Sequence, residues 1–345
     1  MNSRATPLIR TLIASAFTLG LSSAVVAQDK PVALKLSSWV PAQHALNPAL
    51  IAWGESLKAA SGGTLTSTLF PSEQLGKAFD HYDMARDGIA DFSYVNPGYQ
   101  PGRFPIFAAS SLPFLVSNGK AGSAAVDSWY RAYAAKEMKD VQYCFAFVHD
   151  PGAFHSTKKK ITSPNDIKGM KVRPATATVG NMITMLGGTN VQASAPESRD
   201  VLERGVAESI TFPWGSIILF GIDKVVKYHM DVPLYVTPFV WVMNKDKYNA
   251  LSANQKKTVD SHCTPEWAEK VAGSWADFEA GGRTKLANDP AHEVYKLSPA
   301  QLNDWKQAVA PMEKQWADDV QKRGENPAPI INSLRQNLTK YKSAL

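Results

Sequence analysis

Apolar and polar residues in the first hundred positions alternate with two different periods. Residues 32–40, 64–70 and 89–95 are short runs rich in apolar and β-branched side chains, which predict strands. Between them, residues 47–63 place apolar side chains at helical spacing and end at glycine, and residues 75–88 predict a second helix. This order of strand, helix, strand, helix, strand favours a parallel sheet covered by helices.

A short pattern occurs twice in the chain, 117 residues apart. "RDGIADFSY" at 86–94 resembles "ERGVAESIT" at 203–211, and each copy has a glycine followed by a β-branched residue, alanine and an acid. Glycine at such a place permits the left-handed backbone that ends a helix before a strand. The spacing is too long for a solenoid repeat, so the pattern predicts two similar lobes in one chain.

Two longer segments follow the second copy of the pattern. Residues 224–248 are rich in strand-forming side chains, and this run is predicted to cross back between the lobes. Residues 265–289 predict one long amphipathic helix. We interpret its apolar stripe as core packing; the stripe consists of Trp267, Val271, Trp275 and Phe278.

Arg173 stands where a short predicted strand meets a predicted helix, in "KGMKVRPATATVG" at 168–180. In open α/β sheets, ligands bind at the carboxyl ends of the strands. A guanidinium at such an end suits a planar anion such as a carboxylate. From position alone, a surface arginine in a loop is an equal alternative.

The first 27 residues predict a cleaved secretory signal peptide. They combine a charged start, an apolar run and small residues at the expected cleavage site, where Val25 and Ala27 occupy positions −3 and −1. No later stretch approaches the roughly 18 apolar residues that a membrane span needs. The mature chain, residues 28–345, is therefore expected to be soluble and exported.

Charge and cysteine content restrict the partners and the redox state. The 37 basic and 31 acidic residues give a formal charge of +6 that is spread along the chain, which disfavours a nucleic-acid partner. The two cysteines, Cys144 and Cys263, belong to a chain expected in an oxidising compartment. The sequence leaves two possibilities for this pair, a disulfide or two free buried thiols. We take the disulfide as the prediction.

Five motifs, by their order and spacing, connect the chain to a known family. With these motifs it resembles the DctP-type substrate-binding proteins of tripartite ATP-independent periplasmic (TRAP) transporters. The resemblance implies an α/β, two-lobe periplasmic binding protein fold (type II-like) with hinge strands and a long helix spanning both lobes. The motifs are "LFPSEQLG" (69–76), "GIADFSYVNPGY" (88–99), "LPFL" (112–115), "DIKGMKVRPA" (166–175) and "ERGVAESITFP" (203–213).

The resemblance also implies a division of the chain and a role. Residues 28–149 with about 237–285 would form lobe one, and residues 150–236 with about 286–345 would form lobe two. The protein would be periplasmic, monomeric and free of cofactor and metal. It would capture an organic acid and deliver it to an ion-gradient-driven TRAP permease in the membrane. The alternatives are the binding protein of an ATP-driven importer and an exported enzyme, although the HExxH, GxSxG and P-loop motifs are absent.

The family's carboxylate-binding arginine corresponds to Arg173, but two positions depart from the family. Phe212 stands where many members carry asparagine, and residues 150–157 lack a second arginine that some members have. These departures disfavour sialic acid and favour an aromatic or bulky apolar monocarboxylate. Core burial is the alternative for each aromatic candidate. The expected ligand-binding residues are Arg173, the aromatic Trp39, Tyr94, Phe154, Phe212, Trp214 and Phe239, and the polar His44, Asn96 and His155.

Overall fold

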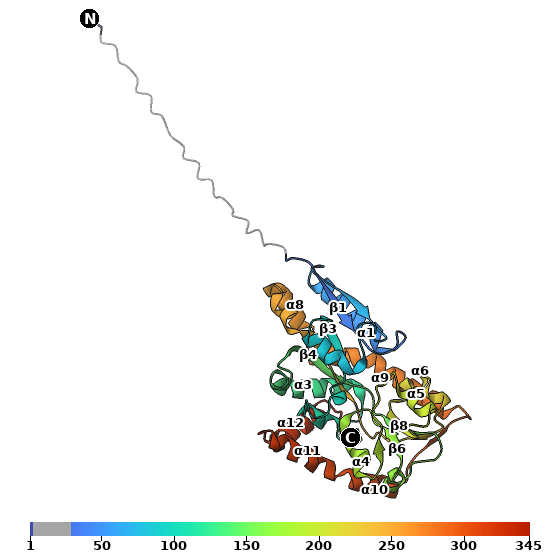
Figure 1. Cartoon of the computed structure of the whole chain (residues 1–345). Coiled ribbons are helices and arrows are strands. Elements are labelled where there is room, and N and C mark those ends of the chain that lie inside the picture. The colour runs from blue at the N-terminus through green and yellow to red at the C-terminus, as the bar shows by residue number, and fades with distance from the viewer. Residues whose placement is uncertain (3–28) are drawn as a thin grey trace.

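The computed structural model describes residues 1–2 and 29–345 (Figure 1). The expected signal peptide, residues 1–27, lies outside the described residues apart from its first two. Among the described residues, no helix is long and apolar enough to cross a membrane. The chain folds around two separate sheets, as the repeated pattern predicts.

The first sheet has the strand order β2-β1-β3-β10-β4. β1 pairs in parallel with β2 and β3, so the predicted parallel β-α-β-α-β start is confirmed, whereas β10 pairs antiparallel with β3 and β4. Its strands are β1 (Val32–Ser37), β2 (Leu65–Phe70), β3 (Phe92–Val95), β4 (Val141–Val148) and β10 (Pro238–Asn244). Its helices are α1 (Leu46–Ala60), α2 (His81–Arg86), α3 (Gly119–Glu137), α7 (Lys245–Ala250) and α8 (Ala253–Ser261).

The second sheet has the strand order β11-β9-β5-β8-β6-β7. β6 pairs in parallel with β7 and β8, whereas β5 pairs antiparallel with β8 and β9. Its strands are β5 (Ala153–Ser156), β6 (Lys171–Arg173), β7 (Thr189–Asn190), β8 (Ser209–Phe212), β9 (Tyr228–Met230) and β11 (Glu293–Tyr295). Its helices are α4 (Ala177–Met185), α5 (Ser198–Glu203) and α6 (Trp214–Leu219).

The repeated pattern occupies the same place in both sheets. Gly88 follows α2 before β3, and Gly205 follows α5 before β8. Their φ angles are 75° and 68°, so each glycine adopts the left-handed backbone that the pattern predicts. The turns after β3 and β8 therefore leave the two sheets at equivalent strand ends.

Several segments connect the two lobes. The chain leaves β4 for β5 and returns from β9 to β10, so the expected crossing within residues 224–248 is confirmed. The long helix α9 (Pro265–Ala287) packs on α1 and α3 of the first lobe and on α6 of the second. A Cβ on Gly282 of α9 would lie 2.1 Å from the Cα of Gly215, so this glycine pair permits the close contact with α6.

Three helices complete the chain, namely α10 (Pro299–Val309), α11 (Pro311–Lys322) and α12 (Pro327–Lys340). α10 packs near residues 164–167 of the second lobe, whereas α12 packs on α3 of the first. The indole of Trp129 in α3 donates to the carbonyl of Ile330 in α12 at 3.0 Å. The C-terminal segment thus contacts both lobes, and the division at about residue 286 stays a proposal.

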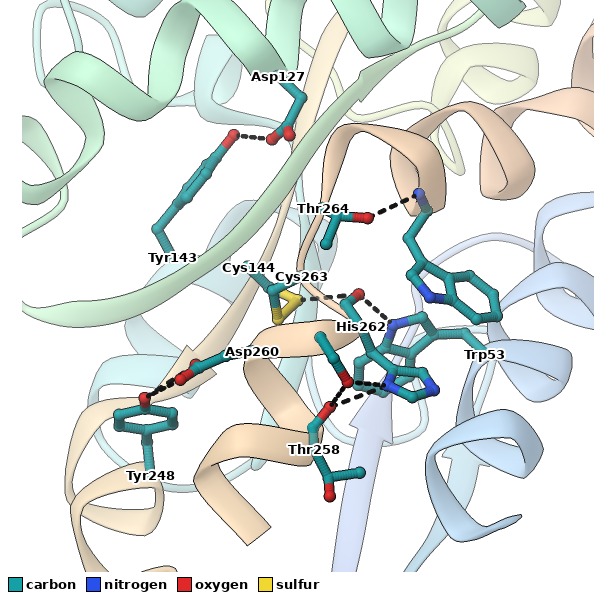
Figure 2. The surroundings of a disulfide bond; sticks show 12 residues. Trp53, Asp127, Tyr143, Cys144, Tyr248, Thr258, Asp260, His262, Cys263 and Thr264 are labelled. Atoms are coloured by element: carbon teal, nitrogen blue, oxygen red, sulfur yellow. Dashed lines mark hydrogen bonds between the residues drawn. A yellow bond between two sulfur atoms is a disulfide. The ribbon is translucent and has the colours of Figure 1, made fainter. Parts of the chain in front are cut away.

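A disulfide joins Cys144 of β4 to Cys263, so the predicted pairing is confirmed (Figure 2). Cys263 directly precedes Thr264, whose side chain caps α9 by accepting from the Trp267 amide at 3.3 Å. The carbonyl of His262 accepts from the indole of Trp53 in α1 at 2.9 Å. These contacts fix the start of α9 against the first sheet.

Candidate ligand-binding site

A small cavity, about 30 Å³ in volume, lies where the strand ends of the two sheets meet. Segments after β1, β3, β4 and β6, the turn from β8 into α6, the return to β10 and one residue of α9 all contribute to its lining. A cavity between lobes at strand carboxyl ends is the usual place of a ligand in α/β folds. It is lined by Trp39, Val40, His44, Asn96, Tyr99, His149, Arg173, Ala175, Ala195, Phe212, Pro213, Ser216, Phe220, Thr237, Phe239 and Trp275.

Arg173 is the last residue of β6 and supplies the cation of this cavity. Its side chain is 1% exposed. Its Nε donates to the Ala193 carbonyl at 3.0 Å and its Nη2 to the Tyr99 hydroxyl at 3.2 Å. A guanidinium carries five N–H donors, so three have no acceptor in residues 29–345. None of the ion pairs among these residues includes Arg173, and a buried charge is costly unless an anion pairs with it.

Tyr99 provides a second donor beside the guanidinium. Its hydroxyl oxygen accepts from Arg173 and from the Ala195 amide at 2.8 Å. Because the Tyr99 oxygen already accepts two hydrogen bonds, its hydroxyl proton can be donated to a ligand. Asn96 is also close, since its amide donates to the Ala175 carbonyl at 3.3 Å and its Oδ1 accepts from Gly98. This part of the cavity therefore presents donors, as a carboxylate requires.

Aromatic rings from both lobes form the walls beside Arg173. Trp39 and Phe239 come from the first lobe, with ring centroids 6.3 Å apart. Phe212 and Phe220 come from the second lobe, 5.5 Å apart and edge to face. The Arg173 Cζ lies 5.5 Å from the Phe212 ring centroid, so the wall and the cation adjoin. Because both lobes contribute aromatic rings, the walls favour an apolar group between the lobes.

The histidines of the cavity are neutral. Burial lowers the pKa of His149 to about 4 and that of His44 to about 3. His149 donates from Nδ1 to the Asp150 carbonyl and accepts at Nε2 from the Thr237 amide at 3.0 Å. Both of its nitrogens are thus used to hold the two hinge segments together. Neither histidine competes with Arg173 for a negative charge.

The structure brings six of the ten sequence-predicted site residues into one cavity. These are Trp39, His44, Asn96, Arg173, Phe212 and Phe239. The cavity is also lined by residues that the sequence did not mark as part of a site. Tyr99 ends the motif at 88–99, and Trp275 belongs to the apolar stripe of α9. The direction in which each side chain points depends on how the two lobes meet. The lining residues not predicted include Tyr99, His149, Ser216, Phe220, Thr237 and Trp275.

The other four predicted residues lie behind or beside the cavity. Tyr94 stacks on Trp39 with centroids 4.8 Å apart, and Phe154 packs on Trp305 in the core. His155 and Trp214 contact each other, at 5.0 Å between ring centroids. Strand neighbours point to opposite faces, so a strand-end position alone does not fix which side a ring takes.

His155 belongs to a chain of three histidines in the second lobe. Its Nε2 donates to the Phe212 carbonyl at 3.0 Å, and its Nδ1 lies 2.7 Å from Nδ1 of His229. His229 Nε2 lies 2.9 Å from Nδ1 of His292. The nitrogens bond one another, and in the described part of the chain no group of three or more His, Cys, Asp or Glu is placed to hold a metal ion.

We expect acid to destabilise this protein through its buried histidines. Burial lowers the pKa of His81 and His155 to about 4 and that of His229 to about 2. Because these values lie below the unfolded value near 6.5, the unfolded chain binds more protons as the pH falls from 6.5 to 4. Each histidine then removes about 1.4 kcal/mol of stability per pH unit.

Four buried carboxyls oppose this effect, because burial raises the pKa of Asp127 to about 6, that of Glu279 to about 7, and those of Glu137 and Asp150 above their usual values. Five histidines outnumber them, so the net free energy of unfolding should be lower at pH 4.5 than at pH 7. Urea unfolding at the two pH values measures the difference. Equal or greater stability at pH 4.5 would contradict the burial of these imidazoles.

Comparison with known proteins agrees with the fold. Residues 36–319 match the family model described as "Bacterial extracellular solute-binding protein, family 7" (DctP). The chain belongs to this family. A curated Salmonella typhimurium protein, YiiZ, is 22% identical to this family-7 protein over 219 residues, which cover 60% of this chain and 65% of that protein.

Several solved TRAP solute-binding proteins share the fold of this family-7 protein. One from Rhodoferax ferrireducens T118, in complex with benzoate, has a TM-score of 0.85 and 28% identity, covering 90% of this chain and 98% of that one. One from a marine metagenome, in complex with 3-hydroxybenzoate, has a TM-score of 0.84 and 33% identity, covering 90% and 99%. One from Bordetella bronchiseptica, with bound mandelate, has a TM-score of 0.84 and 28% identity, with the same coverage.

Proposed function

We propose that this protein captures an aromatic or otherwise apolar monocarboxylate in the periplasm and delivers it to a TRAP permease. The observation that carries this proposal is the buried Arg173 guanidinium. It lines the cavity with three N–H donors that have no acceptor in residues 29–345. A ligand carboxylate supplies the missing anion and accepts two of these donors in parallel.

The aromatic walls of the cavity determine which group the ligand carries in addition to its carboxylate. An aromatic ring buries about 150–250 Å², which corresponds to roughly 4–6 kcal/mol at about 25 cal/mol/Å². The loss of one partner of a buried charge pair costs about 2–5 kcal/mol. A ring held by Trp39, Phe239 and Phe212, with its carboxylate on Arg173, therefore has enough gross energy for micromolar affinity, about −8 kcal/mol.

The relatives support the same ligand class. The three solved proteins at 28–33% identity contain benzoate, 3-hydroxybenzoate and mandelate, each of which joins a carboxylate to a benzene ring. The Phe212 and Trp39 walls of this chain are suited to such a ring. Because no second cation lines the described cavity, a dicarboxylate such as succinate would leave one charge unpaired.

Binding without catalysis accounts for the polar groups of the cavity. His149 uses both nitrogens in hydrogen bonds to the backbone, and His44 uses Nδ1 to accept from the Leu46 amide. Neither imidazole therefore offers a free basic nitrogen, which general-base chemistry would need. Arg173 holds an anion but does not transfer protons.

A thermal-shift screen tests the ligand class. Benzoate and phenyl-substituted 2-hydroxy acids should raise the melting temperature, whereas succinate, glucuronate and sialic acid at equal concentration should not, because the cavity walls are apolar. The Phe212→Asn variant, which replaces a ring by an amide, should shift the preference toward smaller and more polar acids. Stabilisation by succinate with no response to any aromatic acid would overturn the proposal.

A further inference from the structure

A second polar group lies in the ligand cavity, away from Arg173. It consists of His44 and Ser216, which line the cavity, and Glu279 of α9, which lies behind Ser216; we call these three residues the polar end. The ring of Phe212 adjoins Arg173 at 5.5 Å, Phe220 follows 5.5 Å further on, and His44 lies 6.4 Å from Phe220. Successive aromatic contacts thus connect the cation to the polar end.

The proton positions at the polar end are fixed by its contacts. The Leu46 amide donates to Nδ1 of His44 at 3.1 Å, so the neutral ring carries its proton on Nε2. The Ser216 hydroxyl donates to Glu279 Oε1, which leaves the lone pairs of its oxygen free. His44 Nε2 lies 3.5 Å from this oxygen, beyond a strong hydrogen bond. One donor and one acceptor thus lie side by side, joined only by this long contact, which a ligand hydroxyl can replace with two shorter hydrogen bonds.

Glu279 keeps this arrangement in place through the hydrogen bonds that it accepts. Its buried carboxylate also accepts from the Ser216 amide at 3.0 Å, from the Gly215 amide and from the Trp275 indole at 2.5 Å. All four groups donate hydrogen bonds to the carboxyl group of Glu279. The Ser216 hydroxyl therefore cannot turn its proton toward the cavity without breaking its own hydrogen bond to Glu279. A second ligand carboxylate here would meet no cation among the residues that line the cavity, and an unpaired buried charge is costly.

We infer that the polar end binds one neutral hydroxyl of the ligand, and that the preferred ligands are hydroxylated aromatic monocarboxylates. The hydroxyl accepts from His44 Nε2–H and donates to Ser216 Oγ while the carboxylate rests on Arg173. This inference rests on the proposed function, because it requires that a ring acid binds in the cavity. It adds a rule for ring substituents, namely that a hydroxyl is accepted and a second carboxylate is rejected.

Calorimetric titration with matched ring substituents tests the inference. The probes are benzoate, 3- and 4-hydroxybenzoate, 3- and 4-methylbenzoate, and benzene-1,3- and 1,4-dicarboxylate. At one of the two ring positions, the hydroxyl acid should bind at least about tenfold tighter than the methyl acid, because a methyl group leaves the donor and acceptor unpaired. Neither dicarboxylate should bind as tightly as that hydroxyl acid.

Two variants assign the preference to the polar end. Ser216→Ala removes the acceptor, and His44→Asn keeps an oxygen to accept from the Leu46 amide while it removes the Nε2 donor. Each should reduce the hydroxyl-over-methyl preference to about twofold or less, and because this preference is a ratio of two affinities, a general loss of affinity in the variant cancels. Ser110→Ala is the control, since Ser110 is a buried serine bonded to the Phe107 carbonyl outside the cavity.

The outcomes separate this inference from the proposed function. If benzoate binds but neither hydroxyl acid gains over its methyl partner, or both variants keep the full preference, the inference is wrong and the proposed function stands. Tight binding of a dicarboxylate would overturn the inference in the same way. If none of the seven acids binds, the proposed function itself fails.

Discussion

Replacing Arg173 with lysine should weaken benzoate binding by about 2–5 kcal/mol, because a buried charge contact is lost or distorted. Lysine keeps the positive charge, but it lacks the planar fork that holds a carboxylate with two parallel bonds. It also lacks the Nε donor that fixes Arg173 to the Ala193 carbonyl. Calorimetry measures the change in dissociation constant. The matched control is Arg199→Lys, in an exposed pair with Glu203 of α5.

The Arg173→Met variant separates binding from folding. A buried guanidinium without an anion destabilises the ligand-free fold, so this variant should melt at an equal or higher temperature than the wild type. Benzoate should then cause no thermal shift at all. An unchanged dissociation constant in Arg173→Lys, or a normal benzoate shift in Arg173→Met, would show that Arg173 does not hold the carboxylate.

Removing the disulfide should lower the free energy of unfolding by about 4 kcal/mol, since a cross-link between distant residues restricts the unfolded chain. Cys144 and Cys263 are 119 positions apart in the sequence. The bond also ties β4 to the start of α9, the helix that contacts both lobes (Figure 2). Urea unfolding of the Cys144→Ala/Cys263→Ala double variant measures the loss.

The control for this experiment is the wild type with and without reductant. Native protein that has not been reduced should contain no alkylatable thiol by mass spectrometry. Two alkylatable thiols, or a double variant as stable as the oxidised wild type, would contradict the role of the bond.

The fold could be predicted largely from local signals. The glycines at 88 and 205 mark equivalent helix ends, and both adopt positive φ. Short strand patterns gave the parallel start of the first sheet, and the capping threonine at 264 begins the long helix that the apolar stripe predicts. These features depend on contacts between near neighbours in sequence, and such contacts are visible in the residue pattern.

The candidate site could be predicted only in part, because its residues come from segments far apart in the chain. Arg173 and Phe212 were found because a strand end and a departure from a motif mark them. Tyr94 and Trp214 occupy similar positions, yet Tyr94 stacks behind Trp39 and Trp214 contacts His155. Trp275 carries no signal beyond its apolar stripe, although it lines the cavity. Side-chain direction relative to the other lobe decides these cases, and no local pattern encodes it.

A crystal structure of the protein with bound benzoate tests the central claim most directly. We expect the carboxylate within hydrogen-bond distance of the free guanidinium nitrogen of Arg173 and of the Tyr99 hydroxyl. The ring should lie between Trp39 and Phe239 on one side and Phe212 on the other. A ligand bound outside this cavity, or a carboxylate that does not contact Arg173, would contradict the account.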